Sequence, residues 1–63
     1  MAEKLIKYYD YVKSIKGLQG TMALAIHTKI PSTKAAFEPD TDENIRIFKE
    51  AVEKVTEKPA PDL

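Results

Sequence analysis

The sequence predicts an all-α protein, a small bundle of three main helices with a short helical turn. Two long segments place apolar residues at spacings of three and four, which is the helical period, and no segment alternates apolar and polar residues over more than a few positions. A third segment, residues 21–30, is apolar on nearly every side when wound as a helix, which is typical of a buried helix. We therefore expect this central segment to be packed between the other helices.

Length and composition limit what the chain can be. Its 63 residues form at most one domain, and so short a chain buries only about 60% of its extended surface. The lack of cysteine excludes disulfides, and a single histidine argues against a metal site, so we expect no cofactor. Self-association is the remaining common way to stabilise so small a core.

Charge is distributed asymmetrically although the net charge is zero. Residues 1–37 carry six lysines against two acidic residues, or +4, and residues 38–63 carry four basic residues against eight acidic ones, or −4. Such asymmetry can indicate an anionic partner, but we prefer the interpretation that the two halves complement each other within one chain or across a dimer.

No membrane or targeting segment is evident in the sequence. The longest apolar run, residues 22–26, is far shorter than the roughly 20 residues that span a membrane. A cytoplasmic protein without membrane contact is therefore expected.

The first predicted helix covers residues 2–16 and has a wide apolar stripe. Four residues at helical spacing form the stripe and three more widen it: Leu5, Tyr8, Val12 and Ile15, then Ile6, Tyr9 and Tyr11. Gly17 follows where a left-handed residue commonly ends a helix. Because the stripe is wider than one neighbouring helix needs and tyrosine is enriched at interfaces, we predict a protein interface here, formed by Ile6, Tyr8, Tyr9 and Tyr11. Two of the tyrosines could instead belong to the core.

The central predicted helix covers residues 19–30 and ends at Pro31, because the residue before a proline is pushed out of the α region. A helical turn is expected over residues 32–37, with Ser32 as its N-cap. Phe37 is the one large apolar residue of that turn, and we expect it to fill part of the core.

The last predicted helix covers residues 42–57. Either Asp40 or Thr41 can cap its first turn, and Asp40 and Glu43 have the spacing of a capping box. Its apolar stripe consists of Ile45, Phe48, Val52 and Val55. Residues 1–57 are thus expected to form a single domain, and the proline-containing residues 58–63 a flexible tail.

One stretch resembles the helix-turn-helix motif of DNA-binding proteins. That motif has an alanine in its first helix, then a turn glycine, an apolar residue, a serine-like cap and a recognition helix. Here these places are held by Ala25, Lys29, Ile30, Pro31–Ser32 and Ala35. The stretch departs from the motif at Lys29, since a positive φ strains a lysine, and at the recognition helix, which Pro39 limits to scarcely two turns. Under this alternative, residues 29–37 would contact DNA through Lys29, Ser32, Thr33 and Lys34.

The sequence offers no set of catalytic residues. The sequence shows no pattern that would join His27 to a serine or cysteine nucleophile and to an orienting carboxylate. We therefore expect His27 to interact with the C-terminal end of its helix. The acidic residues 38–43 lack the ligand spacing of an EF-hand. We therefore predict a non-enzymatic protein-protein interaction or self-association module whose partner is a second copy or another protein. A minimal helix-turn-helix-like DNA-binding domain is the alternative, and nucleic acid is not the preferred partner.

Overall fold

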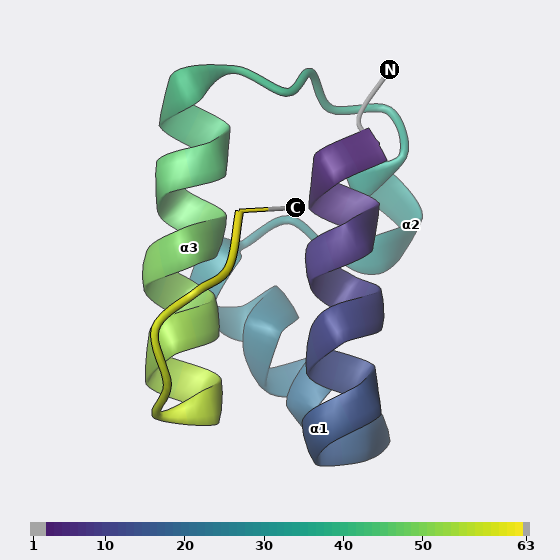
Figure 1. Ribbon diagram of the computed structural model, residues 1–63. Helices are drawn as coiled ribbons and strands as arrows, with labels where there is room; N and C mark the ends of the chain where they lie inside the picture. Colours follow the sequence, from purple (N-terminus) through teal and green to yellow (C-terminus); the bar gives the residue numbers. More distant parts are fainter. Residues whose placement is uncertain (1–2, 63) are drawn as a thin grey trace.

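Three helices account for the regular structure of residues 3–62, the part of the chain that the computed structural model describes (Figure 1). They are α1 (Glu3–Thr28), α2 (Ser32–Ala35) and α3 (Asp42–Thr56), and no strand occurs within these residues. The small all-α bundle predicted from the sequence is therefore confirmed. Residues 1–2 and 63, which the predicted domain and tail include, lie outside the described residues.

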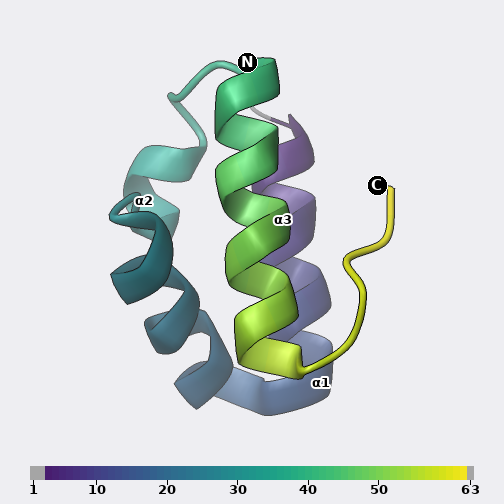
Figure 2. The same cartoon turned by 90° about the vertical axis from the view of Figure 1, so that its left-hand side faces the viewer.

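Helix α1 is bent into two arms at Gly17, whose φ of 70° and ψ of −157° are not helical. The left-handed residue that the sequence predicts at this glycine is found, and the helix resumes at once after it. The predicted helices 2–16 and 19–30 are therefore two arms of one helix. We name residues 3–16 the N-terminal arm and residues 18–28 the C-terminal arm. Figure 2 shows the two arms on either side of α3.

The core lies where α3 packs into the angle between the two arms. Phe48 of α3 is fully buried, and its ring centroid lies 6.4 Å from that of Tyr8 and 5.8 Å from that of Tyr9, which it meets edge-on. Each such aromatic pair adds about 0.5–1.5 kcal/mol beyond the burial of area. The buried apolar residues come from all three helices and are Leu5, Tyr8, Tyr9, Val12, Leu24, Ala35, Phe48, Ala51 and Val52.

The C-terminal arm is buried on one side only, which corrects the expectation that the central helix is enclosed. Gly20, Leu24 and Thr28 are buried, whereas Met22 and Ile26 are mostly exposed. The physical reason is that α3 and the N-terminal arm cover one side of this arm, and no further helix of the described chain is present to cover the other.

Phe37 does not fill the core, contrary to the expectation from the sequence. Its side chain is 88% exposed, and Ala35 takes the buried position in this part of the chain. Helix α2 ends at Ala35, so Phe37 falls in the turn that follows and is directed to solvent. The expected cap is also wrong, because Pro31 occupies the N-cap position of α2 and makes no side-chain capping bond.

Asp40 and Thr41 bind the first turns of different helices. Thr41 Oγ1 accepts a hydrogen bond from the backbone N–H of Asn44 at 3.1 Å, so Thr41 is the N-cap of α3. A carboxylate oxygen of Asp40 instead accepts a hydrogen bond from the backbone N–H of Lys4 at 3.3 Å, in the first turn of α1. Of the two caps that the sequence allowed for α3, the threonine is used, and the aspartate joins the loop before α3 to the start of α1.

Residues 58–62 are not helical, as expected, and they lie beside α3 and the N-terminal arm (Figure 1, Figure 2). Ala60 packs against the core, and the Tyr8 hydroxyl donates a hydrogen bond to the carbonyl oxygen of Pro61 at 2.9 Å. These contacts place residues 60 and 61 against the two helices, and the flexibility of the tail stays a prediction.

Replacing Gly17 by L-alanine is expected to destabilise the fold by about 1–3 kcal/mol, because its backbone conformation is nearly exclusive to glycine. No atom lies within 4 Å of the position that a Cβ would take, so the cost is in the backbone alone. D-alanine is the matched control, since these angles mirror an extended conformation of L-residues, and it should stabilise by about 0.4–1 kcal/mol. Chemically synthesised chains compared by urea denaturation test this, and equal stability of the two alanine variants would contradict it.

Candidate interaction surface

The C-terminal arm of α1 presents an uncharged outer surface. No Asp, Glu, Lys or Arg occurs from residue 17 to residue 28, although these types make up 32% of the chain. Three large apolar side chains of this arm are spaced by four and therefore lie in one row along the helix. These are Leu18, Met22 and Ile26, with 70%, 66% and 74% of their surface exposed, and we call them the apolar row.

The apolar row lies opposite the buried side of the same arm. Gly20, Leu24 and Thr28 form the buried side, also at a spacing of four. The two sets are offset by two residues, which corresponds to about 200° around an α-helix. Burial of one set therefore directs the other to solvent.

Hydrogen bonds at the end of the C-terminal arm hold this orientation. The Tyr9 hydroxyl donates to the carbonyl oxygen of Ile30, which joins the N-terminal arm to the end of the C-terminal arm. Thr28 Oγ1 donates to the carbonyl oxygen of Leu24 at 2.8 Å and accepts from the backbone N–H of Ile30 at 3.2 Å. Burial raises the pKa of Tyr9, and its hydrogen bond with Thr28 opposes this rise in part. The hydroxyl is therefore held in its neutral, donating form.

The residues predicted to form an interface on the first helix are divided between core and surface. Tyr8 and Tyr9 are only 1% and 5% exposed and pack around Phe48, whereas Ile6 and Tyr11 are partly exposed. The wide stripe of this helix is explained by its two neighbours, α3 and the C-terminal arm. The apolar row was missed by sequence reasoning, although its spacing of four and the lack of charge around it are visible in the sequence.

The residues of the helix-turn-helix alternative lie around a short turn. Lys29 has a φ of 61°, the left-handed conformation that the motif's turn requires. Ser32, Thr33 and Lys34 are exposed, but the helix that carries them has only four residues. Because reading of the major groove uses several side chains along a recognition helix, one helical turn presents few positions for it.

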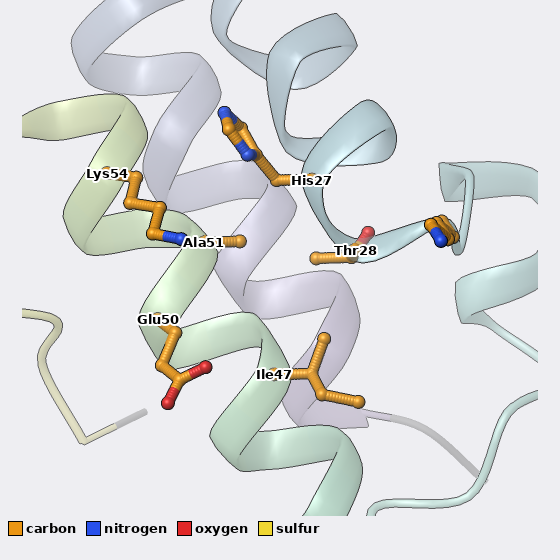
Figure 3. A pocket seen from close by; sticks show the side chains of 7 residues that line it. His27, Thr28, Ile47, Glu50, Ala51 and Lys54 are labelled. Carbon is orange, nitrogen blue, oxygen red and sulfur yellow. The ribbon is translucent and has the colours of Figure 1, made fainter.

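A hollow of about 280 Å³ lies between the end of the C-terminal arm and α3 (Figure 3). His27, Glu50 and Lys54 are among the residues that line it, and Figure 3 shows that their side chains do not point toward a common centre. Elsewhere in residues 3–62 no group of three or more His, Asp or Glu side chains is placed to hold a metal ion.

Comparisons with known proteins add no assignment. The chain matches no protein-family model, no curated protein and no solved structure. None of the helices described is long and apolar enough to cross a membrane. The function must therefore be argued from the surface itself.

Replacing Tyr9 by phenylalanine is expected to lower the free energy of unfolding by about 1 kcal/mol at neutral pH, through loss of the bond to Ile30. Between neutral and alkaline pH, the free energy of unfolding should also fall less in this variant than in the unmodified protein. Because the pKa of Tyr9 is raised in the folded state, its contribution is fully present below the pKa of an unfolded tyrosine and is lost as the pH rises above about 10.

Urea denaturation between neutral and strongly alkaline pH measures both effects. Tyr11→Phe is the matched control, since Tyr11 lies on the same arm but is only half-buried, and it should retain the alkaline loss of the unmodified protein. An alkaline profile of Tyr9→Phe that parallels the profile of the unmodified protein would contradict the assignment.

Proposed function

We propose that the protein is a non-enzymatic self-association module and that two copies pair through the apolar row. The observation that carries this proposal is the row of three exposed apolar side chains on a helical arm without Asp, Glu, Lys or Arg. Contiguous apolar surface of this kind is uncommon on soluble monomers and marks interaction sites. This assignment moves the proposed interface from the first helical arm, where the sequence placed it, to the second.

A second copy is the occupant that fits the row. Met22 is at its centre, with Leu18 and Ile26 one helical turn away on each side. A two-fold axis through Met22 would place Leu18 of each chain against Ile26 of the other, so the row is self-complementary, as a closed dimer requires. Antiparallel pairing also sets the opposite ends of the two helix dipoles side by side.

The expected affinity is modest. Full burial of a Leu, Ile or Met side chain contributes about 1.5–3 kcal/mol, and three such residues per chain are already about one third covered. Association itself costs about 4–15 kcal/mol. Because the gain and the cost are of similar size, we expect a weak dimer that forms only at high protein concentration rather than an obligate one.

Binding of DNA through residues 29–37 remains the second proposal, and the left-handed Lys29 is the observation that favours it. The short α2 counts against it. The two proposals differ in their response to salt, because DNA binding depends on the release of counterions and apolar association does not. An NMR titration with duplex DNA at low salt would show salt-sensitive shifts at Ser32, Thr33 and Lys34 only under the second proposal.

Replacing Met22 or Ile26 by lysine is expected to weaken self-association about ten-fold or more, because a charge would be buried without a partner. Sedimentation equilibrium up to about 1 mM protein tests this, and the dimer of the unmodified chain should persist at about 1 M NaCl, where charge interactions are screened. Thr33→Lys is the matched control, since Thr33 is exposed on α2 and lies outside the row. A monomeric unmodified chain over this range would overturn the proposal.

Cysteine substitution tests the antiparallel arrangement, because the natural sequence contains no cysteine that could interfere. Met22→Cys is expected to form a disulfide with its own copy. Leu18→Cys and Ile26→Cys should instead form one with each other when mixed, and neither should do so alone. Mass spectrometry with one variant labelled by nitrogen-15 separates mixed from self-linked dimers. Self-linking at all three positions would indicate a parallel pair and would contradict the two-fold arrangement while leaving self-association in place.

A further inference from the structure

Residues 58–62, which we call the C-terminal segment, lie extended along α3 and the N-terminal arm. We use the name groove for the surface of these two elements that the segment covers. Figure 1 shows the segment turning back after α3 toward the first arm, and Figure 2 shows it on the side of α3 away from the C-terminal arm. Two prolines in this segment, Pro59 and Pro61, favour an extended backbone in advance of any contact. The groove is therefore separate from the apolar row.

Side chains of the two helices contact the backbone of this segment. The Tyr8 hydroxyl donates to the carbonyl oxygen of Pro61 at 2.9 Å, and the Glu53 carboxylate accepts from the backbone N–H of Ala60 at 3.5 Å. Ala60 packs against the core between these two bonds. Contacts of this type recognise an extended backbone more than a particular side chain, as grooves that bind proline-rich peptides do.

One end of the groove is basic. Lys49 Nζ forms an ion pair with Asp62, and Lys4 also contributes to the positive field at that carboxylate. The contact with Lys49 and the charge of Lys4 hold the pKa of Asp62 below its ordinary value. The acidic side chain next to the second proline is therefore the charged group of the segment that these lysines hold.

The C-terminal segment is held by few contacts, and these are near solvent. The Asp62 side chain is 91% exposed, so solvent screens its ion pair with Lys49 and the pair holds the segment only weakly. Such contacts suffice within one chain, because a short tether gives an effective concentration of about millimolar. A free peptide with the same contacts would therefore compete with a higher apparent Kd while the attached segment is intact, and with a lower one when that segment is weakened.

We propose that the surface of α3 and the N-terminal arm that carries Tyr8, Lys49 and Glu53 is a binding site for an extended, proline-containing peptide with an acidic side chain. The C-terminal segment occupies this site within its own chain, and a segment of the same chemistry on another protein displaces it. The site does not depend on self-association, since none of its contacts involves the C-terminal arm.

The test uses the full chain labelled with nitrogen-15 and the N-acetylated peptide Lys-Pro-Ala-Pro-Asp-Leu, which repeats residues 58–63. The variant Asp62→Lys weakens the attached segment and leaves the groove unchanged. Peptide addition should produce saturable NMR shifts at Tyr8, Lys49 and Glu53 in this variant. The apparent Kd should be about ten-fold lower than for the unmodified chain, where the attached segment competes.

Charge exchange provides the specificity control. The double variant Asp62→Lys/Lys49→Glu should lose the shifts with the acidic peptide. A peptide with lysine in place of its aspartate should bind it about as weakly as the acidic peptide binds the unmodified chain, because the exchanged charges pair again within the chain. The double variant Asp62→Lys/Lys54→Glu is the matched control, because Lys54 is on α3 but makes no contact with the segment that the structure describes, and it should bind like the single variant.

Three results would overturn the proposal. Absence of saturable shifts in Asp62→Lys would show that the groove holds no peptide in trans. Equal affinity in that variant and in the unmodified chain would show that the peptide does not compete with the segment. Shifts at these residues that change with protein concentration before peptide is added would identify the segment of a second copy as the occupant.

Discussion

The bend at Gly17 is the constraint on which the rest of this structure depends. A φ of 70° with a ψ of −157° turns one 26-residue run of helix into two arms, and this combination of angles is nearly exclusive to glycine. The angle between the arms is the space that α3 fills. Without the bend, a straight helix would offer α3 one side, and Leu24 of the C-terminal arm would not join the core.

Two tyrosines of the N-terminal arm each pack in the core and also make a polar contact with a distant part of the chain. Tyr8 and Tyr9 surround Phe48, and each hydroxyl then binds a carbonyl oxygen outside the first arm, at Pro61 and at Ile30. Each ring is thus both a core residue and a tether for a different part of the chain. These two roles explain why a pair of tyrosines expected at an interface lies inside. The same hydrogen bonds also bear on the two surfaces proposed above. The bond to Ile30 orients the apolar row, and the bond to Pro61 holds the C-terminal segment.

Local patterns predicted the helices well, and they failed where the outcome depended on neighbours. The stripes of the first and last helices, the left-handed residue at Gly17 and the cap at Thr41 follow from spacing and from the chemistry of single residues. Phe37 was assigned to the core by its size alone, but α2 ends too early to turn it inward. A helix that is apolar on all sides is predicted to be buried. The pattern does not show how many neighbouring helices are present to cover it.

The sequence by itself determined the helices, the position of the bend and the uncharged character of residues 17–28, because these depend on side chains close together along the chain. The tertiary structure decided which side of that segment is buried and where the last residues lie. Both outcomes depend on how α3 packs into the bend, which brings Phe48 to Tyr8 and Tyr9 and leaves Met22 and Ile26 in solvent. Packing between distant residues selects one side of an apolar helix, and no local pattern contains that choice.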